Sequence, residues 1–170
     1  MGREQTRRAF ERLARAAARI AYGAAGRDFL VLEDDDEMYG YEETPAEKEF
    51  GEAVCGVVET RASRTRNASH VAAAITALVD VRRAVHAYRA RMWQYATDHG
   101  SEVSPCALHA RKLLSWVRTA VPAMSAAGRR RLRRLLTDEA RAATFTSYWF
   151  ASSDTHGSEE VSVAKLVGNG

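Results

Sequence analysis

The residues of this chain that could do chemistry are mainly arginines at helical spacing. Positions i, i+4, i+7 and i+11 of one long helical pattern hold Arg82, His86, Arg89 and Trp93. Arginine beside an aromatic ring is the combination that binds single-stranded nucleic acid, through phosphate contact and base stacking. The four residues therefore form a candidate nucleic-acid site. Because they lie beside the apolar stripe of the same helix, two alternatives stay open: the helix projects beyond the rest of the protein, or an acidic segment of the chain pairs with the arginines.

A second candidate site is a run of five arginines within six positions. Helical projection places them everywhere except on the stripe of Leu132, Leu135 and Leu136, and they are Arg129, Arg130, Arg131, Arg133 and Arg134. Like charges four residues apart repel, and the helix dipole disfavours cations in the N-terminal half of a helix. A polyanion would relieve both penalties, so the run predicts a nucleic-acid contact. The alternative is a basic helix face that is simply solvated.

A third arginine stripe lies on the first predicted helix and consists of Arg8, Arg12, Arg15 and Arg19. Glu4 stands four residues before Arg8, and Glu11 stands four residues before Arg15. This is the favoured order for an ion pair along a helix. The local partners favour an ordinary solvated face over a phosphate contact.

The charge of the chain is segregated. Its 25 Lys+Arg and 22 Asp+Glu give a formal charge of +3. Residues 28–52 hold eleven of the acids and a single base, Lys48, so this window carries −10 and the remainder +13. A body of that charge attracts polyanions. The acidic window is then either a solvated loop that aids solubility or an intramolecular mimic of nucleic acid that competes for the basic faces.

The same acidic window could dock a protein partner. The candidate interaction residues are three acids and two aromatic anchors, Asp34, Asp35, Asp36, Tyr39 and Tyr41. The alternative function is therefore a protein–protein adaptor or a self-assembling subunit, of viral or phage type among others, that uses this loop and the C-terminal tail. A homo-oligomer falls within the same hypothesis.

Catalytic and metal-binding interpretations find little support in the sequence. Cys55 and Cys106 fall on projected apolar faces, which indicates buried small hydrophobes rather than nucleophiles. Cys106 and His109 could share a metal, but a structural zinc site needs four ligands and no second close pair is present. We expect no cofactor and no enzyme. Two cysteines without a signal peptide predict a cytoplasmic or other intracellular protein that is not secreted, and no apolar stretch is long enough to predict a membrane span.

One short element offers a third hypothesis. Arg64 and His70 stand six residues apart and flank Asn67 before a long helix. This element resembles the Arg-x(4–6)-His element of helical-bundle ribonucleases of the HEPN type, over seven residues. The resemblance implies a ribonuclease in which Arg64 stabilises the cyclising phosphate and His70 moves a proton.

The elements that position these residues are predicted to be helices. Apolar spacing and capping signals favour an all-α fold of about five helices in a mostly antiparallel bundle, with helices over residues 3–25, 45–61, 69–98, 105–121 and 126–150. The bundle spans residues 1–151 and contains an acidic loop over 27–43. Residues 152–170 form a polar tail in which 161–167 could be one extended strand, which needs another chain or lies on the bundle. The leading hypothesis is a non-enzymatic accessory or assembly protein that contacts nucleic acid, single-stranded or duplex, without base-specific readout.

Overall fold

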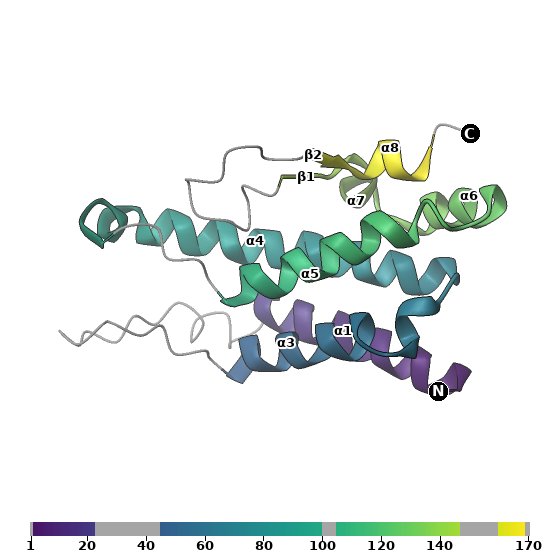
Figure 1. Cartoon of the computed structure of the whole chain (residues 1–170). Coiled ribbons are helices and arrows are strands. Elements are labelled where there is room, and N and C mark those ends of the chain that lie inside the picture. The colour runs from purple at the N-terminus through teal and green to yellow at the C-terminus, as the bar shows by residue number, and fades with distance from the viewer. Residues whose placement is uncertain (1, 23–44, 100–104, 147–159, 169–170) are drawn as a thin grey trace.

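Four long helices make up the body of the protein (Figure 1). The computed structural model describes residues 2–22, 45–99, 105–146 and 160–168, and within α4 it describes side chains only as far as Ala84. The long helices are α1 (Arg3–Tyr22), α3 (Pro45–Val58), α4 (Ala68–His99) and α5 (Pro105–Ala120). The predicted all-α class is confirmed, because the described residues are mostly helical and form only one small sheet.

The four long helices surround one apolar core. Each of them reverses the direction of the helix before it along the chain (Figure 1). α1 packs against α3 and α4, and α5 packs against the same two helices from the other side. The largest fully buried apolar side chains come from all four helices, and they include Phe10, Leu13, Ile20, Phe50, Val54, Ile75, Leu78 and Leu113. Their spacing of three and four residues is what gives each helix one apolar face.

The last predicted helix is wrong in its extent. Instead of one helix over 126–150, the chain forms α6 (Ala126–Leu135), α7 (Asp138–Ala142) and the strand β1 (Thr144–Thr146). Leu136 is extended, with φ −78° and ψ 142°, and the Thr137 hydroxyl accepts a hydrogen bond from Ala140 N. Thr137 followed by two acids is a helix start signal, so it opens a new helix rather than continuing the old one.

The predicted strand over 161–167 is also wrong in part. The chain forms β2 (Glu160–Ser162) and then the short helix α8 (Val163–Val167), which Ser162 caps. β2 needs no second chain, because it pairs antiparallel with β1, with Phe145 opposite Val161. The pairing was not predicted because β1 falls within the helix that was predicted over residues 126–150. Val161, Val163 and Val167 are buried, so this part of the tail folds back onto its own chain.

The α6–α8 region covers α4 on the side away from α1 and α3 (Figure 1). α6 and α7 both pack against α4, and α8 packs against α6 and α7. The second half of α4 runs beyond the described ends of α3 and α5 (Figure 1). None of the helices within the described ranges combines the length and apolar character that a membrane span requires.

Candidate nucleic-acid interface

Arg82 on α4 contacts strand β1 within the fold. Its guanidinium donates a hydrogen bond to the backbone carbonyl of Thr144 at 3.1 Å and lies 5.1 Å from the centre of the Phe145 ring. Burial lowers the pKa of Arg82 from its ordinary value, while Glu139 acts in the opposite direction. This arginine therefore fixes strand β1 to α4, a role that none of the three sequence interpretations included.

The other three members of the first candidate site lie further along α4. His86, Arg89 and Trp93 belong to the half of the helix that runs beyond α3 and α5 (Figure 1). Their side chains fall outside the described residues. The projection of α4 agrees with the first alternative from the sequence, and a nucleic-acid contact by these three residues stays a prediction.

Two arginines of α6 form hydrogen bonds within the fold. Arg129 donates to the carbonyl oxygen of Met124 at 2.5 Å, in the turn between α5 and α6. Arg133 donates to the carbonyl oxygen of Gly168 at 2.6 Å, at the end of α8. Both side chains are half-buried. Arg129 thus closes the turn before α6, and Arg133 holds the end of α8 against α6.

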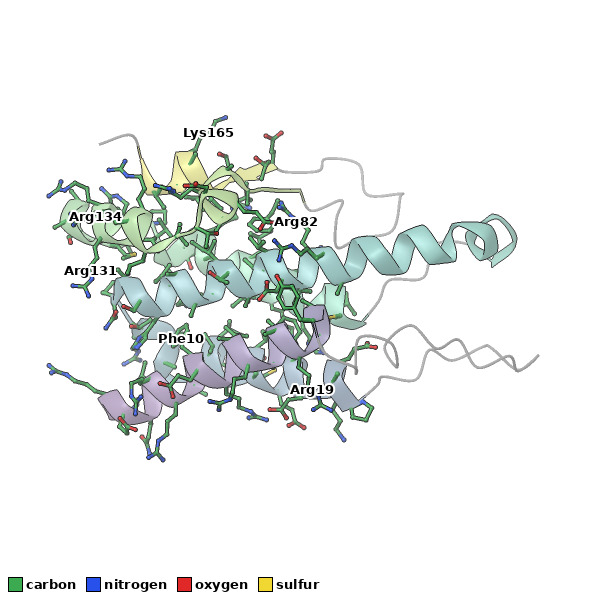
Figure 2. All side chains as sticks on the ribbon, turned by 180° about the vertical axis from the view of Figure 1, so that it is seen from behind. Phe10, Arg19, Arg82, Arg131, Arg134 and Lys165 are labelled. Carbon is green, nitrogen blue, oxygen red and sulfur yellow. The ribbon has the colours of Figure 1, made fainter. Side chains whose placement is uncertain are left out.

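The other three arginines of α6 are exposed. Arg130, Arg131 and Arg134 lie on the side of the helix opposite the buried Leu132. Figure 2 shows Arg131 and Arg134 at the tip of the molecule, with their side chains directed outward. No salt bridge within the described ranges joins any of the three to an acid. α6 therefore presents three unneutralised guanidinium groups on one face.

Half of the six arginines of α1 pair with acids. Arg8 pairs with Glu4 as predicted, but Glu11 pairs with Arg7 rather than with Arg15. Arg12 bonds Glu49 through Nε at 2.7 Å and Nη2 at 3.0 Å, and its Nη2 also lies 3.0 Å from Glu52. The hydrogen bond from Arg12 lowers the pKa of Glu49, with further help from the charges of Arg15 and Arg19. Two acids of the −10 window, both on α3, thus neutralise Arg12, whereas Arg3, Arg15 and Arg19 are exposed and form no salt bridge within the described ranges.

Of the nine remaining acids of that window, Glu47 is the one that lies within the described residues. Glu47 lies on α3 and is fully buried. Asp34, Asp35, Asp36, Tyr39 and Tyr41 lie outside the described residues, and their role in protein interaction stays a prediction. Outside this window, Asp80 and Glu139 pair with Arg83, and Asp138 pairs with Arg141.

Of the two residues in the ribonuclease hypothesis, His70 packs inside the fold and Arg64 is exposed. The Nδ1 atom of His70 lies 2.9 Å from the Thr65 hydroxyl, and its ring stacks on Phe10 with centroids 4.9 Å apart. Burial lowers the pKa of His70. Arg64 is exposed, on the connection before α4. The stacked, half-buried ring of His70 supports the packing of α1 on α4.

The connection between α3 and α4 is a basic feature that was not predicted, apart from the phosphate role of Arg64 in the ribonuclease hypothesis. It forms a short 3₁₀ helix, η1 (Arg61–Arg64), with exposed arginines at both ends. The signal was available, because a Thr N-cap precedes three arginines within six residues. Of the two cysteines, Cys106 is buried and Cys55 is half-buried, and no group of three potential metal ligands occurs within the described ranges.

The fold and these surfaces define an all-α helical bundle in which Arg7, Arg8 and Arg12 of α1 pair with acids and Arg130, Arg131 and Arg134 of α6 are exposed. Comparisons with known protein families, with curated proteins and with solved structures give no match to this chain.

Proposed function

We propose that this protein binds nucleic acid through the exposed face of α6, by contacts to the phosphate backbone. The observation that carries the proposal is the exposure of Arg130, Arg131 and Arg134 on one helix face, with no acidic partner among the described residues. Guanidinium groups bind phosphates through paired N–H donors. Arg82, Arg129 and Arg133 support this face by fixing the elements around it.

The local energetics of α6 favour an anionic partner. Arg130 and Arg134 repel each other at a spacing of four residues. The dipole penalty that the sequence predicts for this run does not apply to Arg133 and Arg134, because α6 ends at Leu135 and places both in its last turn, where the dipole favours cations. A phosphate chain along this face lowers the repulsion between the arginines, whereas water and small ions screen it only in part.

Binding measurements at two salt concentrations test the proposal. Labelled single-stranded and duplex oligonucleotides are titrated with the full chain at about 50 mM and 200 mM salt, and anisotropy gives the affinity. Replacement of Arg130, Arg131 and Arg134 by Gln should weaken binding at least tenfold at low salt. It should also reduce the slope of log affinity against log salt by about three units.

A matched control removes the same charge from the other side of the molecule. Arg3, Arg15 and Arg19 are exposed on α1, so the triple Gln variant at these positions has the same net charge as the α6 variant. We expect this control to bind within a few-fold of the wild type. Absence of wild-type binding at low salt, or equal losses in both variants, would contradict the proposal.

A further inference from the structure

The connection between α3 and α4 presents a second pair of arginines in a defined geometry. Residues three apart in a 3₁₀ helix are eclipsed, so Arg61 and Arg64 lie on the same side of η1. Both side chains are exposed. They line a surface hollow of about 430 Å³ together with Val58, Glu59, Thr60 and Ser63. Arg61 and Arg64 therefore border the same hollow.

The backbone of this connection is held from several directions. Ala62 is fully buried, and the indole nitrogen of Trp116 donates to the carbonyl oxygen of Ser63 at 3.0 Å. The Thr60 hydroxyl accepts from Ala62 N, and the Ser63 hydroxyl donates to the carbonyl oxygen of Thr60 at 2.7 Å. A backbone fixed in this way presents its arginines without an ordering cost for the main chain.

The charge around the hollow is positive. Its one acid, Glu59, lies 3.7 Å from the Lys112 ammonium group, which offsets that charge. Arg66 adds a third guanidinium, whose Nη1 donates to the carbonyl oxygens of Arg64 and Thr65. No salt bridge within the described ranges involves Arg61 or Arg64. The hollow thus suits an anionic group.

The hollow and the exposed face of α6 share one end of the molecule. Figure 1 shows the connection from α3 to α4 and helix α6 at the same end of the bundle. Figure 2 shows Arg131 at this same end of the molecule, and α6 packs against α4, the helix that the connection enters. A long polyanion could contact both surfaces, whereas an isolated phosphate could occupy only one of them.

We propose that the nucleic acid bound by α6 continues over the α3–α4 connection and places a backbone phosphate between Arg61 and Arg64. This inference rests on the proposed function and extends it from one helix face to the whole end of the bundle. All five contacting side chains are arginines, so the interaction is ionic and follows the charge density of the ligand. Duplex DNA carries about one charge per 1.7 Å, which makes it the stronger ligand.

The test replaces Arg61 and Arg64 by Gln in the full chain and leaves α6 intact. The ligand is a duplex of about 20 base pairs, titrated at low and high salt. We expect about tenfold weaker binding at low salt and a decrease of about two units in the salt slope. The control variant replaces Arg15 and Arg19 of α1 by Gln, which removes the same charge, and it should keep the wild-type slope.

The outcomes separate this inference from the proposed function. If the Arg61/Arg64 variant binds as its control does while the α6 variant has lost affinity, the inference is wrong and the proposed function stands. If the α6 variant also binds as the wild type does, both are wrong. Equal thermal midpoints for wild type and variants ensure that a loss of affinity reports on the interface, since all the altered side chains are exposed.

Discussion

The arginines of α1 and those of α6 differ in what lies opposite them. Arg12 on α1 faces Glu49 and Glu52 of α3, so its charge is neutralised within the protein. Arg131 and Arg134 on α6 point away from the bundle (Figure 2) and form no salt bridge with an acid in the described part of the chain. α1 carries six arginines over 20 residues and α6 carries five over 10. The surroundings of Arg12 differ from those of Arg131 and Arg134 because α3 brings two acids beside α1.

α6 contains the same contrast within one helix. Arg129 and Arg133 donate to backbone carbonyls, and Arg130, Arg131 and Arg134 face solvent. Arginine is therefore used in three ways in this protein: to neutralise acids, to fix backbone carbonyls and to present charge. The three uses have different consequences on mutation, which allows the comparison to be tested.

The largest expected effect concerns an arginine that fixes the fold. Replacement of Arg82 by Met leaves the Thr144 carbonyl oxygen without its donor and removes the cation from the Phe145 ring. We expect the free energy of unfolding in urea to fall by about 1–3 kcal/mol, because a half-buried acceptor loses its hydrogen bond. Arg134→Gln, on the exposed face, should change it by less than about 0.5 kcal/mol.

The binding behaviour of the same variants completes this test. Arg82→Met should keep the wild-type salt dependence of nucleic-acid binding. If Arg82→Met is as stable as the wild type but binds nucleic acid more weakly, Arg82 contacts the nucleic acid and does not stabilise the fold.

A smaller effect is expected when the acids beside α1 are removed. In a Glu49→Gln/Glu52→Gln variant, Arg12 loses both of its partners on α3, and Arg15 and Arg19 lose a nearby negative charge. Arg12 then has no acidic partner on α3, as Arg130, Arg131 and Arg134 of α6 have none among the described residues. We expect low-salt affinity for a duplex to increase about threefold, with a salt slope steeper by about one unit. An unchanged affinity and slope would show that neutralisation by α3 is not what distinguishes the two helices.

The smallest expected effect is a pH dependence of stability. The pKa of Glu49 is lowered by the hydrogen bond from Arg12, so this contact stabilises the fold above the ordinary pKa of a glutamate. The contribution is lost as the pH falls through the lowered pKa of the folded state. Both side chains are more than a third exposed, at 42% and 37%, so it should amount to less than about 1 kcal/mol.

Urea unfolding from neutral pH to about pH 3 measures this contribution as the difference between wild type and Glu49→Gln. The difference should shrink toward acidic pH. Arg134→Gln, which has no carboxylate partner, should differ from the wild type by the same amount at every pH. A constant difference for Glu49→Gln would mean that the Arg12 contact does not stabilise the folded state.

The helices with a continuous apolar stripe could be predicted from the sequence to within a few residues. Pro45 begins α3 and Ser125 caps α6 as expected, because these signals act over one helical turn. The region after Leu136 could not be predicted in the same way. Thr137 is a weaker local signal than the apolar spacing that surrounds it, and β1 exists only because β2 pairs with it from more than a dozen residues away.

The candidate site was predictable only in part. The run of arginines on α6 is visible as composition, but its division into supporting and exposed residues depends on where Met124 and Gly168 lie. Arg82 was grouped with the nucleic-acid ladder because periodicity gives the direction of a side chain and not its partner. Arg61 was assigned to no site and Arg64 only to the ribonuclease hypothesis, because a short connection carries no periodicity by which its side chains can be grouped.

The sequence alone determined the all-α class, the positions of the long helices and the separation of a −10 window from a basic remainder. These depend on spacing and charge along the chain, which any fold of the same chain keeps. The tertiary structure decided which arginines meet an acid, which meet a carbonyl group and which meet water. That decision belongs to packing, because electrostatic and hydrogen-bonding partners are set by distance in space, and α3 lies beside α1 rather than beside α6.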